Sequence, residues 1–211
     1  ALKVPVKTLD FYRVRSNTSE CYRLNDSTLD TLLSLSPADI GRENFFSLEI
    51  PSVIKPILSD KAFSNYALSS SDPQVKSELA GLTLGDCFPL GIQDDSMAQC
   101  CLSGLWLLHN FLDESHEISQ SIHSREGSYW HGIMHRMEGD YWNSKYWFRK
   151  TGDHPCLINV LGTSSWHPSD FTDQCEAHQE ADEHLSPALQ EIAVAEWSAL
   201  FAYCYTHASS N

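Results

Sequence analysis

The stretch from residue 97 to residue 122 constrains the fold of this 211-residue chain more than any other part of its sequence. Leu102, Leu105 and Leu108 recur at the spacing of one helical face, and apolar residues continue the pattern to the end of the stretch. We therefore predict one helix over about 97–122, roughly 39 Å long at the rise of an α-helix. Its first half is apolar on nearly all sides, which predicts that it lies at the centre of the protein.

Signals for further helices lie on both sides of this stretch. Asp72–Pro73 and Ser186–Pro187 each place a capping side chain before a proline, an arrangement that favours the start of a helix. The second of these helices is expected to reach about Tyr205, and residues 129–149 are expected to be helical with a break near Gly139. The sequence therefore predicts a mainly α fold, a helical bundle around the long central helix.

The length of the chain suits one folded domain, and 42% of its residues are hydrophobic. We predict a single domain over residues 1–211. Within it, residues 1–24 are expected to form an extended arm or a single strand, and residues 150–185 are expected to be rich in loops.

Charge and cysteine content exclude several classes of protein. The net charge of −14 argues against nucleic acid or a membrane surface as a partner, because both require a basic face. Seven cysteines without a CxxC pair predict buried thiols, neither a disulfide framework nor a zinc ribbon. We expect a cytoplasmic setting, with secretion as the weaker alternative because the sequence begins at Ala1 and carries two glycosylation sequons. The oligomeric state stays open.

Histidines and carboxylates are concentrated between Leu108 and Pro155 at spacings that share a helical face. Two polar stripes result, one formed by His109, Asp113 and His116 and the other by His131, His135 and Glu138. The i, i+4 spacing of His131 and His135 lets two imidazoles converge on one ion. We predict that these two and His116 bind a divalent transition metal, namely zinc, iron or manganese. Glu138 or Asp113 would act as the fourth ligand or as a base.

The leading functional hypothesis is a metal-dependent enzyme that acts on a small polar or anionic molecule. In this hypothesis Arg136 orients an anionic group of the ligand, and Asp113, Glu138 and His109 are candidate catalytic groups. The sequence does not decide whether the protein is an enzyme.

Two alternatives use the same residues differently. The first is a metal-free protein that binds a small polar or sugar-like molecule, with a pocket made of Tyr129, Trp130, Asn143, Tyr146 and Trp147. The second is a structural or interaction protein whose histidines and carboxylates form a buried network. In that network His109 would bond to a backbone carbonyl, Asp113 would act as a cap or pair with Arg136, and His135 would pair with Glu138.

One segment resembles a known family. The stretch GLWLLHNFLDESHEISQSIH, followed by YWHGIMHRMEGDYWNSKYWFRKTGDHP, is similar to uncharacterised fungal and bacterial proteins that carry a YWHxIMHRxExDYxNxKYW segment. The resemblance covers about a quarter of the chain and implies common descent, but no particular reaction. The positions that match the pattern are His109, Asp113, His116, Tyr129, His131, His135, Arg136, Glu138, Asp140, Asn143, Tyr146, Trp147 and His154.

Overall fold

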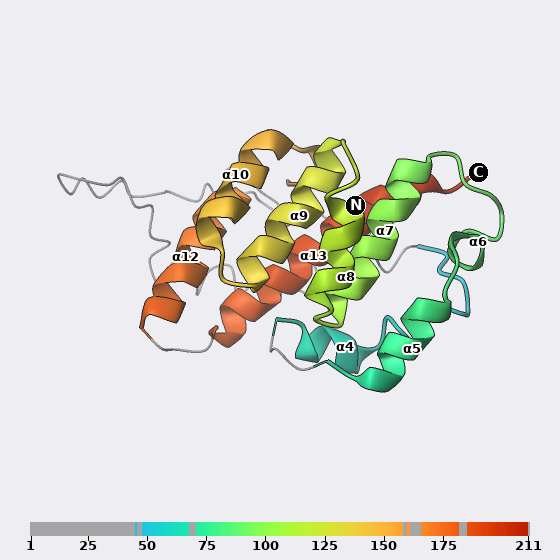
Figure 1. Cartoon of the computed structure of the whole chain (residues 1–211), viewed down its shortest axis with the longest axis horizontal. Coiled ribbons are helices and arrows are strands. Elements are labelled where there is room, and N and C mark those ends of the chain that lie inside the picture. Colours follow the sequence, from blue (N-terminus) through green and yellow to red (C-terminus); the bar gives the residue numbers. More distant parts are fainter. Residues whose placement is uncertain are drawn as a thin grey trace, which may run out of the picture.

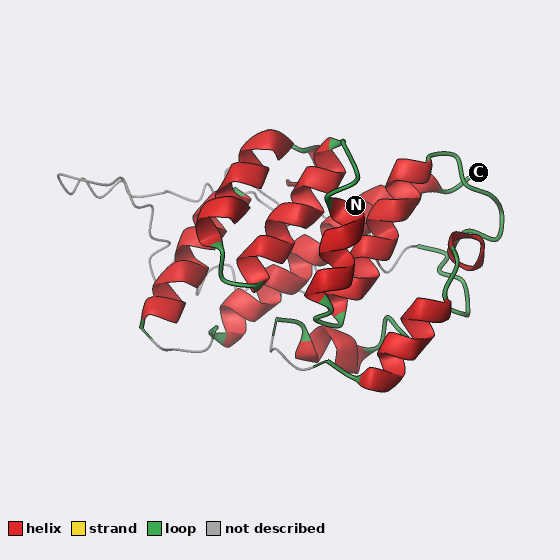
Figure 2. Cartoon of the chain, viewed as in Figure 1, coloured by secondary structure: helices red, strands yellow, loops and turns green. Residues whose placement is uncertain are grey.

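The computed structural model describes residue 45 and residues 48–67, 71–157, 160, 166–181 and 185–210. Over these residues the chain is mainly helical, as predicted (Figure 2). In chain order the elements are α4 (Asp60–Asn65), α5 (Pro73–Gly81), α6 (Leu84–Cys87), α7 (Asp95–Leu108), α8 (Leu112–Ser119), α9 (Arg125–Met137), α10 (Tyr141–Thr151), the short 3-10 helix η1 (Pro155–Leu157), α12 (Pro168–Glu180) and α13 (Pro187–Ala208). The predicted arm at residues 1–24 lies outside the described residues.

Helix α9 has a central position in this arrangement. It lies between α8 and α10, and α13 crosses behind these helices (Figure 1). The centre of the core is aromatic, because Trp130 of α9 and Trp197 of α13 are fully buried and meet edge to face with their ring centroids 6.0 Å apart. None of the helices in the described part of the chain combines the length and apolar character needed to span a membrane.

The prediction of one continuous helix over 97–122 was wrong. The chain forms α7, turns at residues 109–111 and then forms α8. Asn110 adopts a φ of 61°, in the left-handed region that ends helices and that asparagine tolerates better than most residues. The Nε2 atom of His109 lies 2.9 Å from the carbonyl oxygen of Ile57, which ties the turn to an earlier part of the chain. A contact distant in sequence therefore stabilises the break.

The prediction of a loop-rich region at 150–185 was wrong over Pro168–Glu180, which forms α12. The side chain of His167 accepts a hydrogen bond from the backbone N–H of Ser169, so it caps the helix ahead of the proline. Phe171 and Cys175 turn inward from α12 and are buried. The C-terminal helix was predicted correctly, and it ends at Ala208 instead of Tyr205.

Glycines allow α9 to pack closely against its neighbours. A Cβ atom at Gly104 of α7 would lie 2.8 Å from the ring of Trp130, and one at Gly132 of α9 would lie 2.6 Å from the ring of Phe148 in α10. Both distances are too short for real atoms. Gly104 therefore allows close packing of α7 against α9, and Gly132 has the same role on the opposite side of α9.

We expect Gly132→Ala to destabilise the protein by about 1–3 kcal/mol, because the added methyl group collides with a fully buried ring. Gly81→Ala is the matched control, since no atom lies within 4 Å of a Cβ placed at this helical glycine. The control should be neutral or slightly stabilising. Urea unfolding followed by circular dichroism measures both free energies, and equal values for the two variants would contradict the close approach of α9 and α10.

A buried hydrogen bond connects the start of α9 to the segment after α10. The Nε2 atom of His154 lies 3.0 Å from Oε1 of Glu126, and both side chains are buried. The backbone N–H of Cys156 donates to Nδ1 of His154, so the proton of the imidazole sits on Nε2 and faces the carboxylate. Burial by itself raises the pKa of Glu126, but hydrogen bonds from His154, from the backbone and from Ser124 outweigh it and lower this pKa to about 2.

The lowered pKa of Glu126 predicts how the stability of the protein changes with pH. The unfolded chain binds the proton of Glu126 more tightly, so the stabilising contribution of this carboxylate is complete above about pH 4.5 and is lost as the pH falls towards 2. The loss is at most about 3 kcal/mol. In Glu126→Gln this part of the pH dependence should disappear. Urea unfolding of both proteins across this range tests it, and parallel stability curves would show that the pair does not act in this way.

Candidate metal centre

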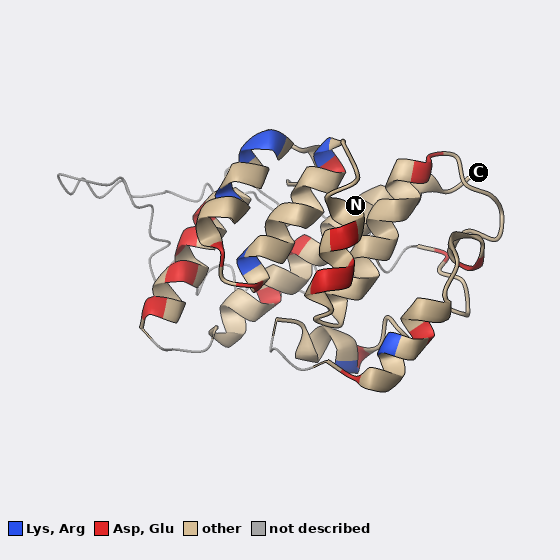
Figure 3. Cartoon of the chain, in the orientation of Figure 1, with Lys and Arg blue, Asp and Glu red and all other residues tan. Residues whose placement is uncertain are grey.

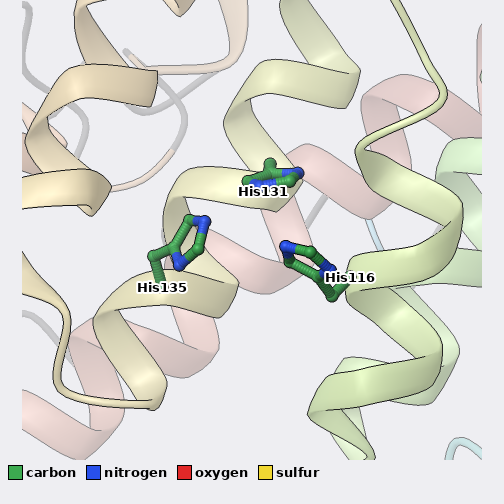
Figure 4. Close-up of side chains that lie close together, drawn as sticks. All are labelled: His116, His131 and His135. Carbon is green, nitrogen blue, oxygen red and sulfur yellow. The ribbon is translucent and has the colours of Figure 1, made fainter.

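Three histidine side chains converge between α8 and α9. His116 comes from α8, His131 and His135 come from α9, and the three rings point toward one another (Figure 4). The ring centroids of His116 and His131 are 4.6 Å apart, those of His131 and His135 are 4.6 Å apart, and those of His116 and His135 are 5.5 Å apart. One nitrogen of each ring lies within 4.8 Å of the others, so the group could hold a metal ion.

Neighbouring side chains orient two of the three rings. Nδ1 of His131 lies 3.2 Å from the hydroxyl of Ser119, and Nδ1 of His135 bonds to the carboxylate of Glu138. A carboxylate only accepts, so Nδ1 of His135 carries the proton. The hydroxyl of Ser119 donates to the carbonyl of His116 and therefore accepts from His131. In both rings Nε2 then keeps its lone pair, the state in which imidazole binds a metal.

The side-chain amide of Asn143 competes for one of these lone pairs. Its Nδ2 atom lies 3.0 Å from Nε2 of His135. A metal ion bound at this nitrogen would replace the hydrogen bond, so Asn143 would have to turn its amide away. Asn143 was predicted to bind a ligand, and the structure places it beside the three histidines.

The surroundings of His131 favour its neutral imidazole form. Burial lowers the pKa of His131 to about 3, and the nearby positive charges that His135, His116 and Lys150 can carry lower it further in the same direction. His131 and His135 are 2% and 6% exposed, while His116 is half-buried. A buried, uncharged imidazole at neutral pH can bind a metal ion without first losing a proton.

Trp147 of α10 forms the wall beside His131. The two ring centroids are 4.1 Å apart, and Lys150 places its ammonium group 4.2 Å from the centroid of the same tryptophan. Tyr146 is partly exposed, and it stacks in parallel with Trp142, which is 75% exposed. The aromatic side chains of α10 therefore extend from the histidine group to the surface.

Tyr129 and Trp130, the other two predicted pocket residues, lie in the core. Both are 0% exposed, and Trp130 packs against Gly104 and Trp197. The structure therefore does not bring the five predicted pocket residues together, because Tyr129 and Trp130 are buried in the core.

Two other predicted residues lie apart from the three histidines. His109 sits in the turn after α7 and contacts the carbonyl of Ile57, which matches the alternative of a backbone-bonded histidine. Burial lowers its pKa. Asp113 is exposed in the first turn of α8, where an acidic side chain interacts favourably with the helix dipole. Neither belongs to the group that could hold a metal.

Arg136 is held by an internal partner. Its guanidinium is buried and makes two bonds to the carboxylate of Glu196 in α13, one of them 3.3 Å long from Nη1 to Oε1. It also lies 4.5 Å from the ring centroid of Phe171. The predicted pair between Asp113 and Arg136 is therefore wrong, and the charge of Arg136, which was predicted to orient an anionic ligand, is paired with Glu196.

Burial raises the pKa of Glu196, and the charge of Arg136 opposes this rise. The hydroxyl of Tyr129 also lies close to this carboxylate and opposes the rise of its pKa. The negative charge of Glu196 is therefore compensated inside the core by these neighbouring groups.

Sequence reasoning missed Ser119, Lys150 and Glu196. Glu196 carried a usable signal, because it is a lone carboxylate within the apolar run AVAEWSALFAY, and a buried charge requires a partner. Ser119 lies three residues after His116, which places both on one helical face. Nothing in the local sequence distinguishes Lys150 from Arg149, since only the packing of α10 shows which cation approaches the histidines.

A cavity of about 450 Å³ lies near this site, and Glu138 contributes to its lining. The other lining residues come from several parts of the chain, and they include Arg136 of α9, Tyr141 of α10, and Cys175 and His178 of α12.

Comparison of the chain with protein-family models, with curated protein sequences and with solved structures gives no match. The resemblance to the fungal and bacterial family stays a prediction.

The pair formed by Arg136 and Glu196 leads to a prediction about stability. We expect Arg136→Met to destabilise the protein by about 3–5 kcal/mol, because it leaves the carboxylate of Glu196 buried without a counter-charge. The double variant Arg136→Met/Glu196→Leu should recover most of this loss, since it removes both charges. Urea unfolding of the three proteins tests this, and a double variant no more stable than the single one would contradict it.

Proposed function

We propose that His116, His131 and His135 bind one divalent transition metal ion and that the protein is a metal-dependent enzyme acting on a small polar molecule. The observation that carries the proposal is the convergence of three imidazoles, two of them with Nδ1 occupied by a neighbouring side chain. Histidine ligands of metal sites are typically held in this way, with the second ring nitrogen bonded to a carboxylate or another polar group.

The number of protein ligands supports an enzyme over a purely structural metal site. Structural zinc sites use four protein ligands, whereas catalytic sites use three and leave a position for water or substrate. Within the described residues the group contains three histidines and no fourth ligand. A metal ion at such a site acts as a Lewis acid and lowers the pKa of a bound water molecule.

The donor set narrows the choice of metal. Three imidazole nitrogens suit zinc or iron, while manganese prefers oxygen ligands. Of the three metals predicted from the sequence, we therefore propose zinc or iron.

Glu138 has a different role in this proposal from the predicted fourth ligand or base. Its carboxylate bonds to Nδ1 of His135, which fixes the ring and makes it a better metal ligand. Glu138 also forms a second possible metal-binding group with His135 and Asp140, but both carboxylates are exposed. We propose that Glu138 positions His135 and does not bind the metal itself.

Metal content measured by elemental mass spectrometry tests the proposal. We expect about one equivalent of metal per chain, on protein purified without an affinity tag. His131→Ala should lower the affinity for zinc by at least about 100-fold, since a ligand is lost. His123→Ala is the matched control, because His123 is exposed and lies outside the three-histidine group. Circular dichroism of the variants verifies that the fold is intact.

Two outcomes would contradict the proposal. One is wild-type protein that takes up no zinc or iron even after dialysis against either ion. The other is equal metal affinity of His131→Ala and His123→Ala. Glu138→Gln adds a graded test, because loss of a side chain that orients a ligand typically lowers metal affinity by about 10–100-fold.

A further inference from the structure

Lys150 is held beside the three-histidine group by aromatic rings. Its ammonium nitrogen lies 4.2 Å from the ring centroid of Trp147 and 4.7 Å from that of Tyr146. Trp147 also contacts His131, with 4.1 Å between the two ring centroids. The ammonium group is therefore within about 8 Å of the His131 ring, roughly one Debye length in physiological salt. A charge at this distance acts on whatever binds at the histidines.

Lys150 makes no ion pair with any residue that the structure describes, although the chain has a net charge of −14. Lys145, on the same helix, is paired with Asp173 and Glu176 of α12. Figure 3 shows the contrast: basic residues gather at the C-terminal end of α10, and acidic residues line α12. The dipole of α10 favours cations at this end, but it does not select their direction toward the histidines.

The charge balance of the proposed centre is positive. Three neutral imidazoles leave the double charge of the metal ion uncompensated, and Lys150 adds a further positive charge. The carboxylates of Glu138 and Asp140, which lie beside His135, offset two of these three positive charges. A ligand that carries negative charge would therefore bind there more favourably than a neutral ligand of the same size.

We infer that the three-histidine centre takes an anionic small molecule, with one anionic oxygen at the open metal position and its charge recognised by Lys150. This inference rests on the proposed function, because it requires the metal. Lys150 takes the anion-recognising role that the sequence analysis gave to Arg136. Trp147 forms the side of the site between the metal position and the ammonium group.

Cobalt(II) gives the experiment a visible signal, since its absorption bands change when a ligand enters its coordination sphere. Cobalt-loaded wild type, Lys150→Met, Lys150→Arg and Lys61→Met are titrated with acetate, an anion, and with imidazole, a neutral ligand. Lys61 is exposed on α4 and is the matched control for loss of a lysine charge. Thermal unfolding shows whether each variant is folded.

Because Lys150 is exposed, we expect Lys150→Met to weaken acetate binding by about 3–5-fold, the upper part of the range for an exposed charge interaction. Its affinity for imidazole should change less than about twofold, which is below the change expected for acetate. Lys150→Arg and Lys61→Met should bind acetate like wild type.

The possible failures are distinguishable. If wild type binds no cobalt, the metal centre itself is refuted, and this inference with it. If cobalt binds and Lys150→Met takes acetate as tightly as Lys61→Met, the metal centre stands and only the role of Lys150 is refuted. Equal weakening of acetate and imidazole would likewise overturn it, because it would show a disturbed site and no recognition of charge.

Discussion

The buried pair between Arg136 and Glu196 sets the orientation of α9, on which the rest of the site depends. A guanidinium and a carboxylate that are both removed from water must stay together, because separating them leaves an uncompensated charge in the core. The pair fixes the rotation of α9 against α13. With one side of the helix held in this way, His131 and His135 face α8 and α10. The pair thus acts on the candidate centre without touching it.

Close packing on both sides of α9 maintains the same arrangement. Gly104 and Gly132 lack the side-chain atoms that would push α7 and α10 away, so large rings fill the space. Trp130 is one of those rings, and it belongs to the core and not to a ligand pocket. Residues that resemble a binding surface in the sequence are in this case the residues that hold the helices together.

The three-histidine group depends on the turn that separates α7 from α8. A continuous helix over 97–122 would keep the direction of α7 and would carry His116 along the same axis. The left-handed residue Asn110 redirects the chain, and α8 then runs beside α9, so that His116 meets His131. Ser119 comes into place through the same turn, and its hydroxyl holds the ring of His131. One backbone conformation therefore supplies both a candidate ligand and the group that orients another.

The sequence alone was sufficient for the mainly α fold, for the C-terminal helix and for the selection of His116, His131 and His135. These features depend on periodicity and on residues three or four positions apart, which local geometry determines. The sequence could not show that Arg136 pairs with a residue inside the core, that Tyr129 and Trp130 lie in the core and not at the candidate site, or that Lys150 lies near that site. Those outcomes depend on contacts between residues far apart in the chain, such as Arg136 with Glu196 and His109 with Ile57. The rotation of one helix against another decides them, and spacing along a single helix carries no information about that rotation.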